Sequence, residues 1–379
     1  MSRYQSFFSK TEVVFGTGML DRLNAYRGQK VAIVTDAFMA KSGALDRVRA
    51  HLSGSDCFVY DEAIPEPPIE TVSKGAGLLA DFEPDAIVAL GGGSAIDAAK
   101  AILAVVREVK PQLTIQFVAI PTTSGTGSEV TSYAVISDPA SNRKFPLVSN
   151  SLIPDVAILD PEFVRTAPAN VTADTGMDVI THAIEALASS RSSYCSDALA
   201  AKALTLAFES LPVAFRNGDD LEARAEMHQA SCMAGMAFNS AGLGLNHGMA
   251  HAIGGQFHVA HGRLNAMLLP LVIEYNAGLS EGAAFCEKTA DVYAKAATSL
   301  GLRFPSIKMG VWALIHAIER LNAQFNIPAT LRGQGIDMNA YSHSEQTLVK
   351  AIFSDACTAT NPRKPVAQDL VRLLRRLGG

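Results

Sequence analysis

The sequence is poor in cysteine and has no cysteine pair at metal-binding or redox spacing. Its five cysteines are dispersed over 379 residues without a CxxC motif: Cys57, Cys195, Cys232, Cys286 and Cys357. A dispersed, odd number of cysteines excludes a disulfide scaffold and indicates reduced thiols in a reducing compartment.

Excess positive charge and long apolar runs are also missing. The formal net charge is −5 at pH 7 and no Lys/Arg-rich block occurs, which excludes a nucleic-acid-binding surface. The N-terminal stretch MSRYQSFFSKTEVVFG has no apolar core of signal-peptide length, and no uninterrupted apolar run reaches membrane-spanning length. We therefore expect a cytoplasmic protein with neither a nucleic-acid nor a membrane partner.

The chain is long enough for two domains, since single cores usually stop growing below this length. In the first part, short apolar and β-branched runs alternate with helix-length segments; the runs cover residues 31–36, 57–63, 86–93, 117–123 and 156–160. This alternation predicts a doubly wound, mostly parallel sheet.

The alternation of strand-like runs and helix-length segments ends near Pro161, where prolines and Asn170 interrupt it. Alanine- and leucine-rich segments with a period of 3.6 residues follow, with few strand candidates. We predict an α/β domain over residues 1–165 and an all-helical domain over residues 166–379.

Four of the nine histidines lie in the apolar stretch Gly242–Gly262: His247, His251, His258 and His261. Such surroundings offer few charged partners, so surface solvation is a poor explanation for them. A lone histidine on an apolar helix is more often a hydrogen-bonded core residue than a metal ligand, but a cluster of four favours a metal site.

A partner for this cluster lies about sixty residues upstream. Asp178 and His182 are four residues apart in TADTGMDVITHAIEAL and share one helix face. We expect Thr172 or Asp174 to cap this helix. A carboxylate and imidazoles together suit Fe²⁺, Zn²⁺, Co²⁺ or Mn²⁺, and spacing alone does not select which histidines bind.

Two loops in the first domain are candidates for binding a phosphate-containing cofactor. Gly91, Gly92, Gly93 and Ser94 separate a strand from a helix, which suits a phosphate at the helix N-terminus. The turn lacks the full dinucleotide fingerprint, because Ile96 occupies the position of the third glycine. Glycine turns after strands are common, so this turn, taken alone, could equally be an ordinary loop that binds no ligand.

The second loop, residues 121–129, reads PTTSGTGSE directly after a strand and supplies five hydroxyl groups. In parallel sheets, ligands bind at the carboxyl ends of the strands. At the end of another strand, Asp36 could accept hydrogen bonds from a ribose and would repel a 2′-phosphate. A helix cap is an equally good explanation of Asp36.

Taken together, these motifs resemble the iron-containing, or group III, alcohol dehydrogenase family. Its blocks occur in order from about residue 10 to the end of the chain: GGGSAIDAAKA, AIPTTSGTGSEVT, KFP, PDVAILDPE, ADTGMDVITHAIEA, GLGLNHGMAHAIGGQFHVAHGRLNAMLLP and SDACTATNPR. Within the family, the chain is most similar to the propanol and ethanol dehydrogenases of propanediol and ethanolamine utilisation. The implied fold is the two-domain one shared with dehydroquinate synthases.

The resemblance also implies a site. The metal ligands, Fe²⁺ first and Zn²⁺ as an alternative, would be Asp178, His182, His247 and His261. The residues binding NAD would be Asp36, Gly92, Gly93, Ser94, Asp97, Thr122, Thr123, Thr126, Thr131, Val135 and Lys144. His251 would relay a proton or, alternatively, only support the metal site. Glu66 stands where many members have asparagine, which puts one contact to the adenosine end of NAD in doubt.

The implied activity is NAD(H)-linked interconversion of short-chain primary alcohols and aldehydes, such as 1-propanol and propionaldehyde. Apolar residues near the histidines, Phe238, Leu243 and Met249, favour an aliphatic substrate over a polyol. Alternatives are a glycerol or 1,2-diol dehydrogenase, a sugar-phosphate cyclase, or a non-catalytic NAD- or metal-binding scaffold. Scarce Lys and Arg near the histidines disfavour the cyclase, which must hold phosphate. We further expect a homodimer or larger homo-oligomer and association with a bacterial microcompartment.

Overall fold

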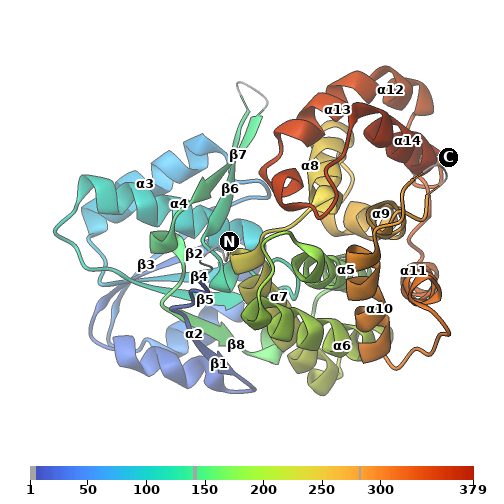
Figure 1. Cartoon of the computed structure of the whole chain (residues 1–379). Helices are drawn as coiled ribbons and strands as arrows, with labels where there is room; N and C mark the ends of the chain where they lie inside the picture. Colours follow the sequence, from blue (N-terminus) through green and yellow to red (C-terminus); the bar gives the residue numbers. More distant parts are fainter. Residues whose placement is uncertain (1–5, 140–142, 281–282) are drawn as a thin grey trace. The chain divides into compact units, whose positions relative to one another are not determined.

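The computed structural model describes residues 6–139, 143–280 and 283–379, which form two compact units (Figure 1). The α/β unit comprises Phe8–Ala167 and Gly218–Asn239. The helical unit comprises Pro168–Asn217 and Ser240–Gly379, together with Ser6 and Phe7.

A six-stranded parallel sheet forms the centre of the α/β unit, with the strand order β1-β8-β5-β4-β2-β3. The strands are β1 (Glu12–Phe15), β2 (Lys30–Asp36), β3 (Asp56–Ala63), β4 (Ala86–Gly91), β5 (Gln116–Pro121) and β8 (Val156–Leu159). The predicted parallel sheet is confirmed, and β1 is an additional edge strand that the sequence pattern did not reveal.

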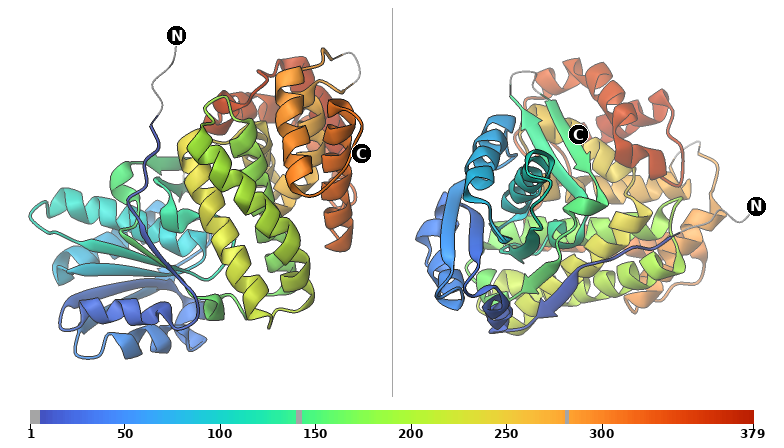
Figure 2. Two further views of the ribbon diagram at one scale, coloured as in Figure 1. Left: turned by 60° about the horizontal axis from the view of Figure 1, so that its bottom comes forward. Right: turned by 90° about the vertical axis from the view of Figure 1, so that its left-hand side faces the viewer.

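Alternate side chains of the strands enter two separate cores, because successive residues of a strand point to opposite faces. In β2, Ala32 and Val34 pack in one core, whereas Val31 and Ile33 pack in the other. Helices cover both faces of the sheet (Figure 2). They are α3 (Ile69–Phe82) and α4 (Gly93–Val109) on one face, and η1 (Met19–Tyr26) and α2 (Ala44–His51) on the other.

An antiparallel hairpin and several short turns complete the α/β unit. The hairpin consists of β6 (Tyr133–Asp138) and β7 (Arg143–Val148). The short elements are α1 (Ala37–Lys41), η2 (Ser128–Val130), η3 (Asn150–Leu152) and η4 (Pro161–Phe163).

The helical unit is built around α5 (Ala169–Ala188), which packs against α6 (Tyr194–Arg216) and α9 (His261–Ala277). The α5–α6 approach is close, since a Cβ at Gly176 would lie 2.2 Å from Leu211 Cδ1. The other elements are α8 (Leu245–Phe257), α10 (Glu287–Ser299), α11 (Ile307–Gln324), α12 (Met338–His343), α13 (Glu345–Ser354), η5 (Ala356–Thr360) and α14 (Ala367–Gly378).

The start of α5 differs from the expectation that Thr172 or Asp174 caps it. The helix begins at Ala169, and Pro168 occupies the cap position without a side-chain hydrogen bond. Thr172 and Asp174 are inside the first turns. The prediction was wrong because Pro168 already sets the extended conformation that a helix entry needs.

Most of α7 (Leu221–Ala241) belongs to the α/β unit. The sequence pattern had placed these residues in the all-helical domain, residues 166–379. The Arg224 guanidinium donates to the carbonyl oxygens of Gly218 and Ala167 at 3.0 and 3.1 Å. Further along, a Cβ at Gly235 would lie 3.0 Å from Gly127 Cα. Contacts that are distant in sequence therefore tie this helix to the α/β unit.

In the described part of the chain, one helix, α6, is long and apolar enough to cross a membrane by length and composition. This is weak evidence for a membrane span, because core helices of water-soluble proteins pass the same criterion. The residues Ala200, Ala203, Leu204 and Ala207 of α6 are fully buried in the helical unit.

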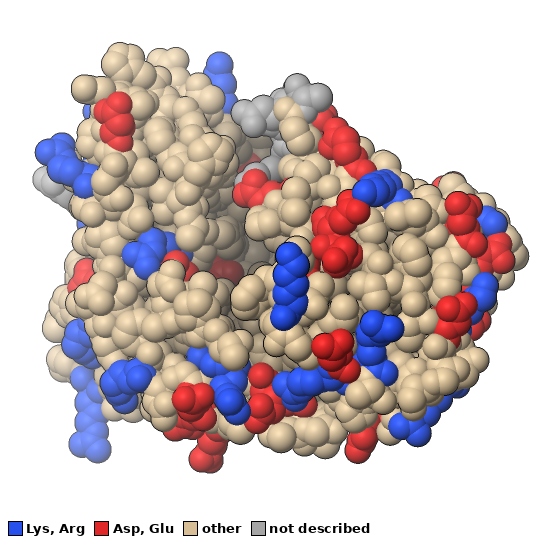
Figure 3. Space-filling model, turned by 180° about the vertical axis from the view of Figure 1, so that it is seen from behind, with Lys and Arg blue, Asp and Glu red and all other residues tan. Residues whose placement is uncertain are grey.

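On the face drawn in Figure 3, acidic and basic side chains are interspersed.

Candidate active site

Three elements of the helical unit bring a carboxylate and two imidazoles together. Asp178 on α5 is buried, and its Oδ1 lies 3.6 Å from both His247 Nε2 on α8 and His261 Nε2 on α9. The three donor atoms all lie within 4.8 Å of one another. This is the arrangement expected if one cation is to bind all three residues.

A glycine next to His261 makes this convergence sterically feasible. A Cβ at Gly262 would lie 2.0 Å from the carbonyl oxygen of Asp174 and 3.4 Å from Asp178 Cβ. Only a residue without a side chain therefore allows the first turn of α9 to lie against α5. His261, the first residue of α9, is thereby placed beside Asp178.

His182 lies next to this group of three. Its ring stacks on that of His247 with a centroid distance of 4.7 Å and an interplanar angle of 16°. Its Nε2 is 3.9 Å from Asp178 Oδ2. The structure thus places all four predicted ligands in one neighbourhood, with His182 slightly further out.

Glu185 controls the orientation of His247. Its Oε2 lies 2.5 Å from His247 Nδ1, and its Oε1 accepts the backbone N–H of Asn246 at 2.7 Å. Because Nδ1 bonds to Glu185, Nε2 is the ring nitrogen that faces Asp178. Burial opposes the charged form of the imidazole, but Glu185 and Asp178 raise the pKa of His247 to about 9.

The electrostatics around Asp178 fit a divalent cation. Burial alone would raise the pKa of Asp178, yet the surrounding His182, His261 and His247 hold it below its usual value. Within the described residues Asp178 forms no ion pair with Lys or Arg; Arg263 pairs instead with Asp174, at 3.1 Å. An ionised, buried carboxylate facing imidazole nitrogens is a donor set typical of Zn²⁺ and Fe²⁺.

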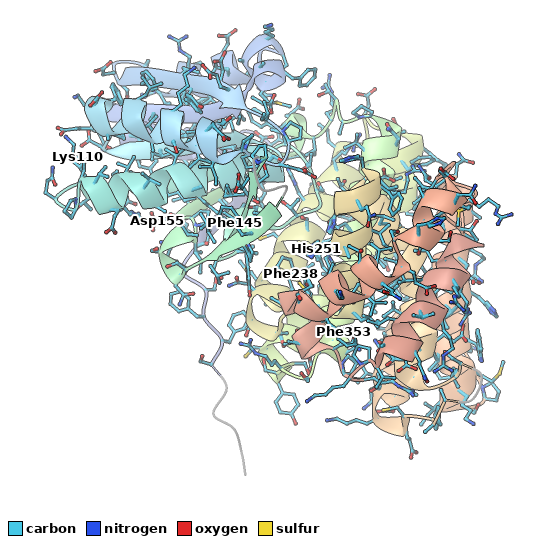
Figure 4. All side chains as sticks on the ribbon, turned by 90° about the horizontal axis from the view of Figure 1, so that it is seen from above. Lys110, Phe145, Asp155, Phe238, His251 and Phe353 are labelled. Carbon is cyan, nitrogen blue, oxygen red and sulfur yellow. The ribbon has the colours of Figure 1, made fainter. Side chains whose placement is uncertain are left out.

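His251 and His258 lie outside the group of three. His251 on α8, labelled in Figure 4, is exposed, and its Nδ1 lies 2.9 Å from Asp355 Oδ2. Its ring stacks on that of His261 with a centroid distance of 5.2 Å. His258 is exposed and ends α8 in the left-handed conformation, with φ of 53°.

Two residues of this region were missed in the sequence, Glu185 and Asn265. Glu185 follows His182 by three residues, and Asn265 follows His261 by four, so each shares a helix face with a predicted ligand. Asn265 Nδ2 lies 2.7 Å from Asp178 Oδ1. For both residues, the available signal in the sequence was a spacing that places them on the same helix face as a predicted metal ligand.

The two predicted cofactor loops of the α/β unit pack against each other. The backbone at Gly91 has φ of 153°, and a Cβ at Gly93 would lie 2.6 Å from Thr126 Cγ2. Thr122 is buried and its N–H donates to the carbonyl oxygen of Gly91 at 3.0 Å. The strand β4 therefore leads into a tight turn that hydroxyl-bearing residues cover at the N-terminus of α4.

Asp97 and Lys100 of α4 hold the segment that follows the second loop. Asp97 accepts hydrogen bonds from Ser128 Oγ at 2.6 Å and from the Val135 N–H at 2.9 Å. The buried Lys100 ammonium donates to the carbonyl oxygens of Thr131 and Tyr133. Asp97 thus shapes the loop, since both its oxygens are engaged within the unit.

The remaining predicted cofactor residues are spread around this turn. Ser94 is in the first turn of α4, and Val135 is exposed on β6. Asp36 Oδ1 accepts the N–H groups of Phe38 and Met39, each at 2.9 Å, so it caps α1. The side chain of Lys144 lies outside the described part of the chain.

Family models match the two parts of the chain. Residues 10–161 match "Iron-containing alcohol dehydrogenase", and residues 172–378 match "Fe-containing alcohol dehydrogenase family, C-terminal". The chain is 42% identical over 376 residues to the 1-propanol dehydrogenase PduQ of Citrobacter freundii, covering 98% of this chain and 100% of the relative. It is 38% identical over 370 residues to an NADPH-dependent butanol dehydrogenase of Clostridium saccharobutylicum, covering 93% and 92%.

Solved structures agree with this match. The iron-containing alcohol dehydrogenase from Thermococcus thioreducens has a TM-score of 0.88 and 32% identity, covering 98% of this chain and 99% of that one. The sulfoacetaldehyde reductase from Bifidobacterium kashiwanohense, in complex with NAD⁺, has a TM-score of 0.87 and 25% identity, with both chains fully covered.

The fold and these matches define an oxidoreductase that acts on alcohols. The chain belongs to the iron-containing alcohol dehydrogenase family. The predicted family, fold class and alcohol dehydrogenase activity are thereby confirmed, whereas the individual site residues remain predictions.

Proposed function

We propose that this alcohol dehydrogenase interconverts short-chain primary alcohols and aldehydes with NAD(H) and a divalent metal, Fe²⁺ first. Asp178, His182, His247 and His261 would hold the metal. The observation that supports this most is the position of Asp178 Oδ1, 3.6 Å from the Nε2 atoms of both His247 and His261.

The bound metal would supply Lewis-acid chemistry, which lowers the pKa of an alcohol and polarises an aldehyde. Asp178 provides the negative charge of the donor set, and Glu185 holds the His247 ring so that Nε2 points inward. In the α/β unit, the Gly91–Ser94 turn would bind the pyrophosphate of NAD, and the hydroxyl-rich loop (residues 121–129) would line the remainder of the cofactor.

His251 is proposed to pass a proton between the substrate hydroxyl and solvent. Its side chain is 40% exposed, and Asp355 holds it through Nδ1, which leaves Nε2 for proton exchange. The alternative is that His251 only supports the ring of His261. His251→Ala with full metal content and an unchanged pH–rate profile would exclude the proton relay.

The substrate is proposed to be a short aliphatic alcohol. The relative named 1-propanol dehydrogenase, 42% identical along nearly the whole chain, supports this choice. Of the apolar residues expected to favour it, Met249 is fully buried, and we assign it to the core of the helical unit. Higher kcat/KM for 1-propanol and ethanol than for glycerol and 1,2-propanediol is expected, and a preference for the polyols would contradict it.

A sugar-phosphate cyclase is a poor fit to the helical unit. Such an enzyme needs cations that are available to phosphate, and Arg263, the basic residue nearest in sequence to the histidine cluster, is paired with Asp174.

The test is metal analysis of anaerobically purified protein combined with a propionaldehyde-dependent NADH oxidation assay. We expect about one divalent metal per chain, loss of activity on chelation and recovery on adding Fe²⁺. Full NADH oxidation by metal-free protein would refute the metal-dependent mechanism. A bound metal without turnover of any alcohol or aldehyde would refute the proposed substrate class.

Cytoplasmic location, homodimer formation and association with a microcompartment also remain proposals. Light scattering of the purified protein tests the oligomer, and co-purification with shell proteins from the native cell tests encapsulation. A monomer in solution would contradict the expected homodimer.

A further inference from the structure

A closed ring of hydrogen bonds links four buried polar residues, one of which is the candidate metal donor His247. Glu185 bonds to His247 Nδ1 and to the Asn246 N–H. Asn246 Nδ2 in turn donates to Asn265 Oδ1 at 2.9 Å and to the Asn265 carbonyl oxygen at 3.1 Å. Asn265 Nδ2 completes the ring, 3.1 Å from His247 Nε2.

Within this ring Asn265 has an unusual position, since one amide nitrogen contacts three candidate donor atoms. Asn265 Nδ2 lies 2.7 Å from Asp178 Oδ1, 3.1 Å from His247 Nε2 and 3.0 Å from His261 Nε2. Asn265 and Asn246 are both fully buried. Placing a carboxamide there is costly unless its hydrogen bonds are satisfied, so a purely apolar packing role is a poor explanation.

The direction of the Asn265 amide is fixed by its neighbour. Because Asn246 donates to Asn265 Oδ1, the NH₂ group must be the end that faces the donors. Its N–H donates to the Asp178 carboxylate, a charge-assisted hydrogen bond. An amide nitrogen has no available lone pair for a metal, so Asn265 takes space beside the donors without adding a ligand.

We propose that Asn265 is a positioning residue: it holds Asp178, His247 and His261 in place and prevents a further ligand from approaching on its side. The residue would thereby limit the coordination number of the bound metal. The inference rests on the proposed function, in which Asp178, His247 and His261 bind one divalent metal.

Two substitutions separate these roles from a merely structural one. Asn265→Ala removes the hydrogen bond to Asp178 and opens the space that the amide fills. Asn265→Asp keeps the shape but replaces the N–H donor by carboxylate oxygens, which can themselves bind a metal. The matched control is Asn322→Ala, because the buried Asn322 donates to the carbonyl oxygen of Ala266, next in sequence to Asn265, at 2.8 Å.

The experiment loads full-length metal-free protein with Co²⁺. Visible absorption reports the coordination number, since four-coordinate Co²⁺ absorbs more strongly than six-coordinate Co²⁺, and chelator competition gives the affinity. For Asn265→Ala we expect an affinity loss of about 10- to 100-fold, the usual effect of removing a supporting hydrogen bond. For Asn265→Asp we expect a weaker, shifted spectrum of higher coordination. Asn322→Ala should keep the wild-type spectrum and affinity.

Wild-type spectra and affinities in both Asn265 variants would overturn the inference while leaving the proposed function intact. Failure of the wild-type protein to bind Co²⁺ or Fe²⁺ would overturn both. If Asn265→Ala does not fold, circular dichroism will show it, and the near-isosteric Asn265→Asp then decides through its Co²⁺ spectrum alone.

Discussion

In the helical unit, the predicted metal donors all sit on helices, whereas in the α/β unit the predicted coenzyme residues lie mostly on turns, loops and helix starts. Asp178 and His182 are on α5, His247 is on α8, and His261 begins α9. By contrast, Thr122, Thr123 and Thr126 belong to a loop directly after β5. Figure 1 labels the helices α5, α8 and α9, and the strand β5 that precedes the loop.

The difference follows from what each ligand demands. A metal ion needs a few donor atoms at fixed distances, which packed helices with a supporting ring of hydrogen bonds provide. A pyrophosphate needs unpaired N–H groups and close approach of the backbone, which a glycine turn at a helix N-terminus provides. Removing the donor charge should therefore weaken metal binding, whereas filling space in the glycine turn should weaken coenzyme binding.

Removing the charge of Asp178 should have the largest effect. Asp178→Asn keeps the shape but leaves the imidazoles without their carboxylate, and breaking a buried charge pair costs about 3–5 kcal/mol. We expect metal affinity to fall by about two to three and a half powers of ten, measured by chelator competition. Coenzyme affinity, measured by NADH fluorescence, should not change; metal retained at wild-type affinity would contradict the assigned ligand set.

A pH effect is expected from His228, which lies in the part of α7 that belongs to the α/β unit. Its Nδ1 is 3.0 Å from Ser124 Oγ, and burial lowers the pKa of His228 from 6.5 to about 4. As the pH falls from 6.5 to about 4, His228 takes up a proton in the unfolded chain but stays neutral in the folded protein. Stability should therefore decrease with falling pH, by about 3 kcal/mol from this group.

His228→Gln should remove that contribution. The measurement is urea unfolding of both proteins between about pH 7.5 and pH 4, where the variant should gain relative to wild type as pH falls. Other titrating groups, including those of the helical unit, cancel in the difference. If the difference in unfolding free energy between the two proteins does not change with pH, His228 is not held neutral in the folded protein.

The sequence was most informative where local pattern determines structure. The β-branched runs predicted five of the six parallel strands, and the spacing of Asp178 and His182 identified one face of α5. The β6–β7 hairpin was missed because its strands mix apolar with polar and charged residues. The grouping of α7 with the α/β unit was missed because it depends on Arg224 and Gly235 contacting residues far away in sequence.

The supporting residues of the site illustrate the same limit. Glu185 and Asn265 have helix-compatible spacing, but polar residues on helices are usually solvated, so nothing local marks them as buried. Only the packing of α5, α8 and α9 shows that Glu185 bonds to His247 and Asn265 to Asp178. Spacing gave the candidate donors; the hydrogen bonds that orient them required the tertiary structure.

Filling space in the glycine turn should have a smaller effect than removing the donor charge. In Gly93→Ala the new Cβ would meet Thr126 Cγ2 at 2.6 Å and displace the hydroxyl-rich loop. Overpacking of this kind costs about 1–3 kcal/mol, so the KM for NADH should rise by about 5-fold to 140-fold. The control is Gly77→Ala on α3, where the added Cβ meets no atom within 4 Å. An unchanged KM would place the coenzyme away from this turn, and metal content should stay at the wild-type value.

The smallest expected effect concerns coenzyme choice at Asp36. Asp36→Asn can keep the hydrogen bonds to the N–H groups of Phe38 and Met39, so α1 stays capped while the charge is lost. A charge near a 2′-phosphate is worth about 1 kcal/mol in water at 4 Å, so discrimination against NADPH should weaken by about fivefold. The ratio of kcat/KM for NADH and NADPH measures this, with Asp46→Asn on α2 as a control for losing one exposed charge. If the ratio is the same in both variants, Asp36 serves only as a helix cap, and coenzyme choice must come from another part of the α/β unit.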